Sequence, residues 1–182
     1  MSTFDRLVPG AWNFDPAHSE VGFTVRHAGI SKVHGAFGQT DATLNVAEDI
    51  AHSTVEATIQ TASVSTGNAD RDAHVRGEDF FDVEQFPVMT FTSTSFDLVD
   101  GQGTVTGELT IKGITKNVEL EAEFNGVVVD AFGMTRAGFE AKTTISRKEF
   151  GLTWNAAIEA GGVLVSDKVV INLDVAFTAP QA

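Results

Sequence analysis

The sequence predicts an all-β protein, in the form of an extended eight-stranded antiparallel barrel with one or two short helices in the connection at 68–85. The chain holds 21 Val and 20 Thr but only 8 Leu, and β-branched side chains are stiff at χ1 and suit strands. Apolar and polar residues alternate with a period of two along most of the chain, as they do in a strand with one wet face. Seventeen Gly against four Pro indicate many tight turns.

The first strands are predicted at 18–27, 32–46 and 53–61. In the first of these, Val21, Phe23 and Val25 share one face. A turn is expected at 27–31, where Ala28 and Gly29 follow a histidine. In the third, apolar residues alternate with Thr and Glu.

The segment 68–85 breaks the period of two and is expected to be helical in part. Asn68 suits the start of a helix and Gly77 its end, so a helix is predicted near 68–76. A further turn of helix is predicted to reach about residue 84.

Five more strands are predicted at 88–99, 102–112, 115–129, 135–147 and 167–178. Asp100 and Gly101 are a strong hairpin signal between two of them. Lys112 and Gly113 indicate another short reversal. A second candidate turn of helix lies at 147–152.

Closure into a barrel is expected because the strands must bury one apolar face and pair their edges. Eight long strands with one apolar face need a partner layer, and the chain has too little helix to supply one. Closing the sheet on itself removes its edges and buries the apolar face. A two-sheet sandwich is the alternative, because it needs the same alternation. No repeat or linker interrupts the chain, so one domain over 1–182 is expected.

Composition excludes several classes of function. The chain has no Cys, which removes disulfides, thiolate metal sites and a Cys nucleophile. Its net charge of −13 predicts repulsion from nucleic acid and from anionic lipid surfaces, and allows a monomer or a homodimer. No apolar run is long enough for membrane insertion or a secretory signal, so a cytoplasmic location is expected, or a periplasmic or secreted one for a mature form.

The inward face of such a barrel is apolar. Its side chains either pack into a core, or they surround a cavity that could hold a long apolar ligand. The pattern leaves both alternatives open. If a cavity exists, the residues expected to line it are Val21, Phe23, Val25, Val55, Ile59, Phe91, Leu109, Leu120, Phe139, Ile171 and Leu173.

The sequence carries few signals of chemistry, and none for a cofactor. His27 and His34 flank a turn and could face each other, but exposed histidines without a metal are the commoner case. Asp70 and His74 share a helix face, which allows a general base oriented by a carboxylate. A polar clamp over a pocket mouth and a plain surface helix are the other interpretations. Phe80 and Phe81 are expected to pack beneath the connection.

Four segments in order resemble the YceI-like family, which comprises lipocalin-like proteins associated with polyisoprenoid binding. The longest runs from Arg71 to Pro87 and continues through 89–93. The others are the opening Trp12–Phe23, the hairpin 107–116 and the turn 145–152. The resemblance extends from about residue 10 to 177. It implies a lipocalin-like barrel with a long apolar pocket and no catalytic residue set.

The function expected from this resemblance is binding, storage or transport of an isoprenoid-type lipid, such as a polyprenyl pyrophosphate or a quinone tail. The head group would be read by polar residues at the mouth, with Arg71, His74, Arg76 and Arg147 as candidates. An enzyme that uses His74 and Asp70 on a lipid-like substrate is one alternative. A ligand-free interaction domain is the other.

Overall fold

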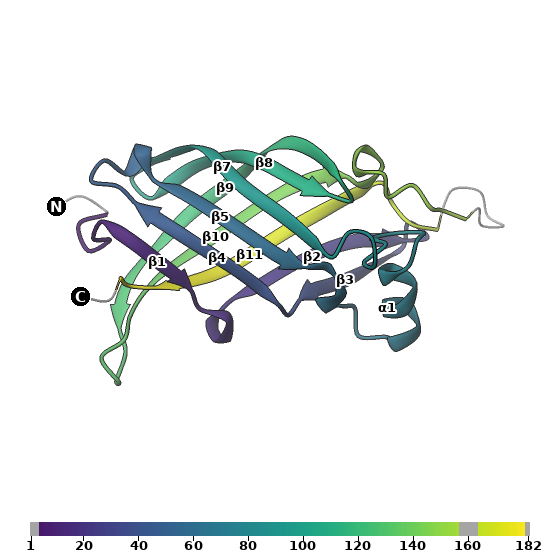
Figure 1. The fold of residues 1–182 in the computed structure, drawn as a ribbon, viewed down its shortest axis with the longest axis horizontal. Coiled ribbons are helices and arrows are strands. Elements are labelled where there is room, and N and C mark those ends of the chain that lie inside the picture. Colours follow the sequence, from purple (N-terminus) through teal and green to yellow (C-terminus); the bar gives the residue numbers. More distant parts are fainter. Residues whose placement is uncertain (1–3, 157–163, 181–182) are drawn as a thin grey trace.

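The computed structural model describes residues 4–156 and 164–180, and within them the chain forms a closed eight-stranded antiparallel barrel (Figure 1). The predicted fold class is confirmed. The strands are β1 Gly10–Phe14, β2 Glu20–His27, β3 Ser31–Phe37, β4 Thr40–Val46, β5 Thr54–Gln60, β6 Val64–Ser65, β7 Val88–Val99, β8 Gln102–Ile111, β9 Ile114–Val129, β10 Thr135–Ser146 and β11 Lys168–Thr178.

The closed ring runs β1-β4-β5-β7-β8-β9-β10-β11 and returns to β1, and every pairing is antiparallel. Closure occurs where Phe14 of β1 lies opposite Phe177 of β11. β2 and β3 extend this wall toward the end of the barrel where α1 lies (Figure 1). A closed ring leaves few unpaired strand edges, as the sequence argument requires.

The strand predicted at 18–27 is present as β2, but the prediction of one continuous strand over 32–46 is wrong. The chain passes from β3 to β4 at Gly38, whose N–H donates to the carbonyl of Ser63. β3 pairs with β2 and β6, whereas β4 pairs with β1 and β5. β1, which precedes the predicted strand 18–27, is separated from β2 by the short 3₁₀ helix η1 Pro16–His18.

The two predicted hairpin turns are confirmed. Asp100 and Gly101 join β7 to β8, and Lys112 and Gly113 join β8 to β9. All four residues have positive φ, between 52° and 83°. This left-handed backbone is the one that two-residue hairpins favour.

The predicted helix is α1 Ala69–Arg76, capped by the Asn68 side chain, which accepts a hydrogen bond from Arg71 N–H. Beyond Gly77 the connection to β7 continues as hydrogen-bonded turns in place of a second helix. Three more 3₁₀ helices are η2 Ile50–His52, η3 Thr61–Ser63 and η4 Arg147–Phe150. The last of these confirms the turn of helix predicted at 147–152.

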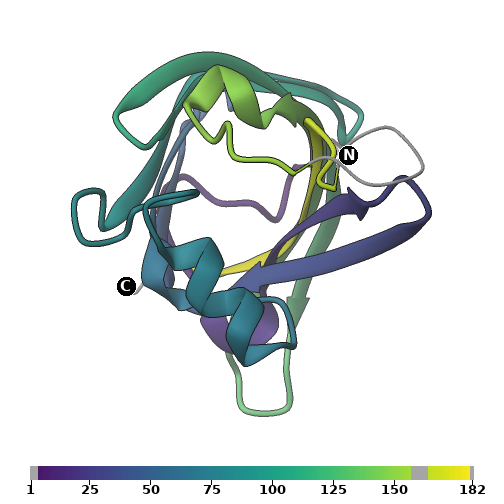
Figure 2. The ribbon, with the colours of Figure 1, turned by 90° about the vertical axis from the view of Figure 1, so that its right-hand side faces the viewer.

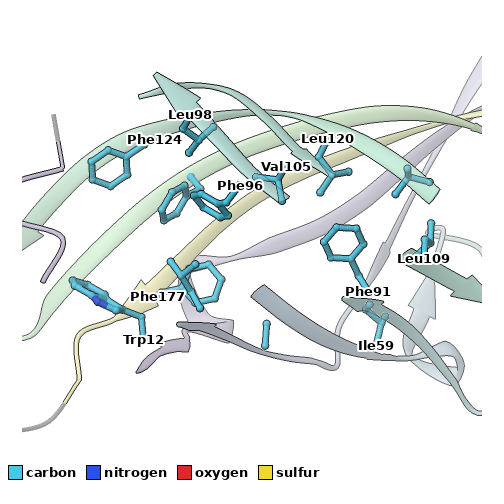
Figure 3. Close-up of a cluster of buried hydrophobic side chains, with 14 of the residues drawn as sticks. Trp12, Ile59, Phe91, Phe96, Leu98, Val105, Leu109, Leu120, Phe124 and Phe177 are labelled. Atoms are coloured by element: carbon cyan, nitrogen blue, oxygen red, sulfur yellow. The ribbon is translucent and has the colours of Figure 1, made fainter. Parts of the chain in front are cut away.

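One end of the barrel is filled by side chains (Figure 3). Trp12 of β1 is fully buried there. The ring of Phe124 lies 5.2 Å from that of Phe4 and 5.1 Å from that of Phe139, and Phe139 lies 6.1 Å from Phe177. This packed core, at the end opposite α1, closes the barrel and positions the space beyond it.

Candidate ligand-binding cavity

Between the packed core and α1, the barrel encloses a cavity of about 610 Å³. Both alternatives left open by the sequence are therefore realised, a core at one end and a cavity along the rest. Every apolar residue predicted to line a cavity lies along its wall: Val21, Phe23, Val25, Val55, Ile59, Phe91, Leu109, Leu120, Phe139, Ile171 and Leu173.

The wall is built by the period of two in the strands that surround it. Alternate residues of each strand point inward, so Val169, Ile171 and Leu173 of β11 face the cavity together. These three side chains are half-buried, unlike the fully buried residues of the packed core. Partial exposure of inward apolar groups is what an open interior produces. The surface presented to a ligand is therefore almost entirely hydrocarbon.

Two glycines on the wall leave room for aromatic rings. A Cβ added to Gly35 of β3 would lie 2.2 Å from the Phe23 ring, and one added to Gly107 of β8 would lie 2.5 Å from the Phe91 ring. Each ring therefore occupies the space that a side chain would fill on a neighbouring strand. The sequence analysis missed these pairs, because they depend on cross-strand register.

Aromatic side chains gather at the cavity mouth. His74 of α1 lies 4.7 Å from Trp154 and 5.1 Å from Phe80, and Phe80 and Trp154 are 5.5 Å apart. The interplanar angles of 86° and 76° at His74 are edge-to-face geometries. All three residues line the cavity. Phe80, expected only to pack under the connection, thus also forms part of the entrance.

The His74–Asp70 pair, one of the alternatives that helical spacing allows, does not form. His74 Nε2 lies 2.9 Å from Asp79 Oδ2, in the turn that follows α1. Asp70 lines the cavity mouth, but it is not the carboxylate that orients the imidazole. The i,i+4 spacing that suggested the pair is overridden by the turn after Gly77, which brings Asp79 back to the helix. The observed contacts hold His74 in place among two rings and a carboxylate.

Arg71 and Arg76, two of the cations predicted at the mouth, both donate to neighbouring backbone. Arg71 lines the mouth and donates to the Thr66 hydroxyl at 2.8 Å and the Thr66 carbonyl at 2.6 Å. Arg76 donates to the carbonyls of Ala62 and Val64 and lies outside the cavity lining. Arg76 thereby ties α1 to η3 and β6.

Asp72 anchors α1 to Thr66, the residue that also binds Arg71. Its carboxylate accepts hydrogen bonds from Thr66 N–H at 2.7 Å and from the Thr66 hydroxyl at 2.6 Å. The Thr66 hydroxyl lowers the pKa of Asp72 below its ordinary value, against burial, which raises it. The carboxylate is therefore held ionised where α1 meets the barrel rim.

Arg147, the remaining predicted cation, is only 3% exposed and lines the cavity from η4. Its guanidinium donates to the carbonyls of Leu152, Trp154, Val165 and Ser166. Burial lowers the pKa of Arg147 below its ordinary value, and the Asp167 carboxylate opposes that shift. Arg147 thus holds together the two segments of the rim on either side of the undescribed residues 157–163.

The histidines flanking the β2–β3 turn do not face each other. His27 lies opposite Ser31, and His34 lies opposite Thr24, whose hydroxyl is 3.0 Å from His34 Nδ1. Within 4–156 and 164–180, no three His, Asp or Glu residues are grouped in a way that could hold a metal ion. None of the helices in the described part of the chain combines the length and hydrophobicity that a membrane crossing requires.

A closed antiparallel barrel with an interior apolar cavity open at one end belongs to the lipocalin-like class of folds. The family model for the YceI-like domain matches residues 12–177. The chain therefore belongs to the YceI-like family. A UPF0312 protein of Staphylococcus epidermidis is 36% identical over 169 residues, which cover 92% of this chain and 96% of the relative.

Solved structures share the fold, among them the two that follow. Burkholderia cenocepacia BcnA superposes with a TM-score of 0.78 at 24% identity, covering 90% of this chain and 98% of that one. A polyisoprenoid-binding domain from Saccharophagus degradans, implicated in plant cell wall breakdown, superposes with a TM-score of 0.70 at 15% identity. It covers 95% of this chain and 100% of that domain.

Proposed function

We propose that this protein binds an isoprenoid-type lipid, a polyprenyl pyrophosphate or a quinone tail, in the barrel cavity and stores or carries it without catalysis. The observation that carries the proposal is the cavity itself: about 610 Å³, lined by aliphatic and aromatic side chains, with charged groups and histidines confined to one mouth. This volume is within the roughly 300–1,000 Å³ of small-molecule sites. The fold shared with a polyisoprenoid-binding domain supports the same ligand class.

Such a cavity favours long apolar chains but does not discriminate strongly between chains of similar length. Each CH₂ moved from water into an apolar site contributes about 0.8 kcal/mol. One methylene more or less changes affinity little, so discrimination must come from the head group. At the mouth, Arg26 and Arg71 supply positive charge and His74 a polar ring. These groups suit either a pyrophosphate or a quinone head.

Catalysis is left out of the proposal for a structural reason. The acid–base alternative rests on a pair between His74 and Asp70. His74 instead pairs with Asp79 and packs edge-on against Phe80 and Trp154. The open cavity likewise gives a ligand-free interaction domain no support, since a filled barrel would suit that role.

The test compares a variant that fills the cavity with one that does not. Ala141 of β10 lines the cavity, whereas Thr144 on the same strand is exposed. Purified wild type should release lipid on organic extraction, and added prenyl diphosphates or quinones should raise its melting temperature. Ala141→Phe should lose both effects, and Thr144→Phe should keep them. A wild type that carries no lipid and shows no shift with any of these ligands would contradict the proposal.

A further inference from the structure

The positive charges of this acidic chain gather along one arc of the cavity rim. The arc comprises the mouth ends of β8, β9, β10, β11, β2 and β3, which follow one another around the barrel. Within its segments 26–32, 112–116, 147–151 and 164–168 there are two acidic residues, Glu149 and Asp167. The cations of this rim arc are seven of the chain's twelve: Arg26, Lys32, Lys112, Lys116, Arg147, Lys148 and Lys168.

The rim arc keeps its charges out of ion pairs. In the described part of the chain, the positive partners of the ion pairs are His18, His74, Arg136 and Lys142, none of which belongs to the arc. Arg26 and Lys32 even lie directly opposite each other across β2 and β3. Like charges in that position destabilise a sheet. Arg147 is buried and holds the rim together, and Lys112 donates to the Glu78 carbonyl. Among the described residues, the exposed cations of the arc that have no such structural contact are Arg26, Lys32, Lys116, Lys148 and Lys168.

Apolar side chains stand among these cations. Ile30, at the tip of the β2–β3 turn, is 86% exposed and lies between Arg26 and Lys32 in the chain. Ile114, at the β8–β9 turn, is 37% exposed and lies between Lys112 and Lys116. The two turns are at opposite ends of the rim arc, and the β2–β3 hairpin projects from the rim in Figure 2.

We propose that the rim arc docks the protein on an anionic lipid bilayer, with Ile30 entering the interfacial region. Cations close to an anionic leaflet attract it, and an apolar side chain among them adds a second, salt-independent contribution. A nucleic-acid backbone offers an apolar tip no comparable environment, whereas the interfacial region of a bilayer does. Docked in this way, the cavity mouth faces the membrane. This role rests on the proposed function, because a lipid could then pass from bilayer to cavity without crossing water.

The net charge of −13 does not prevent this orientation. Acids also lie at the mouth outside the arc, in α1 and the turn after it, where Lys112 of the arc donates to the Glu78 carbonyl. Along the strands of the arc itself, the nearest wall carboxylates include Glu20 and Asp174, each six residues from Arg26 or Lys168. Six residues of strand span about 20 Å. The Debye length at physiological ionic strength is about 8 Å, so charges that far from the bilayer are largely screened. The expectation of repulsion drawn from net charge applies to other orientations of the barrel.

The test is sedimentation of the full chain with vesicles of phosphatidylcholine, with and without phosphatidylglycerol. The protein should sediment with the anionic vesicles only, and less so at high salt. Lys148→Gln with Lys168→Gln should weaken binding by about fivefold per cation and flatten its salt dependence. Ile30→Ser should weaken binding at every salt concentration. Glycerol phosphate, which offers the head-group chemistry without a surface, should not compete.

Matched controls come from the rest of the barrel. Phe132 is 95% exposed in the turn between β9 and β10, and this turn lies at the opposite end of the barrel (Figure 1). Lys142 is exposed on β10, away from the mouth. Phe132→Ser and Lys142→Gln should bind vesicles like wild type. Ala141→Phe should also dock normally, which separates docking from cavity loading. Docking is refuted if wild type fails to sediment, if Phe132→Ser abolishes binding while Ile30→Ser does not, or if soluble polyglutamate binds as tightly as vesicles.

Discussion

At the scale of single residues, Gly35 leaves the space that the Phe23 ring occupies at the cavity wall. The ring occupies the space above Gly35, and an added Cβ would lie 2.2 Å from its edge. Gly35→Ala must therefore push the ring toward the interior, because the barrel wall lies on the other side. Overpacking of this kind typically costs about 1–3 kcal/mol.

We expect Gly35→Ala to lower the amount of lipid bound per protein molecule, measured by extraction or native mass spectrometry, and to lower the melting temperature modestly. Gly38→Ala is the matched control, since its nearest neighbour would be the Ser63 carbonyl at 4.0 Å. Unchanged lipid loading in Gly35→Ala would show that the ring does not set the cavity's width.

Residue-level prediction succeeded where the signal was local. The inward apolar residues follow from alternation within each strand, and each lies on the cavity wall. The contact of Phe23 with Gly35 could not be predicted, because it requires the register of two strands. The partner of His74 was missed because Asp79 returns to the helix through a turn that helical spacing does not describe.

At the scale of elements, four neighbouring strands present a row of acids on the outer wall. Glu20 of β2 lies opposite Asp174 of β11, Asp174 opposite Glu140 of β10, and Glu140 opposite Glu123 of β9. Facing like charges on a sheet repel, typically by a fraction of a kcal/mol per pair. Glu140 has an acid on both sides.

Glu140→Gln should therefore raise the free energy of unfolding, by about 0.5–1 kcal/mol at low salt and less at high salt. Urea unfolding at two ionic strengths measures this. Glu56→Gln on β5 is the control, because its cross-strand neighbours are Thr43 and Thr92. Equal effects at both positions would mean that the row carries no repulsion.

Element boundaries were predictable wherever one strand keeps the same neighbours throughout. β7, β8, β9, β10 and β11 end within a residue or two of their predicted limits. Alternation did not predict the separate strand β1 before Pro16–His18 or the interruption at Gly38. At Gly38 the chain changes partner strands while the alternation stays intact on both sides. The alternation of apolar and polar residues within one segment carries no information on which strands pair with it.

At the scale of the whole molecule, one end of the barrel interior is packed and stabilises the fold, and the rest is an open cavity suited to a ligand. Phe124 belongs to the packed end and contacts the rings of Phe4 and Phe139. Leu173 faces the open cavity and is half-buried. Truncation to alanine should therefore act mainly on stability at the packed end and mainly on ligand binding along the cavity.

Phe124→Ala should lower the free energy of unfolding by about 3–5 kcal/mol, because it leaves a void among packed rings. Leu173→Ala should cost less than the roughly 2–5 kcal/mol typical of a buried leucine, because its side chain already borders open space. With an added prenyl diphosphate or quinone, the rise in melting temperature should persist in Phe124→Ala and shrink in Leu173→Ala. Calorimetry with and without ligand measures both quantities on each variant. If the ligand-induced rise were lost in Phe124→Ala and kept in Leu173→Ala, the packed end would be the binding site, and the assignment of the two halves would have to be reversed.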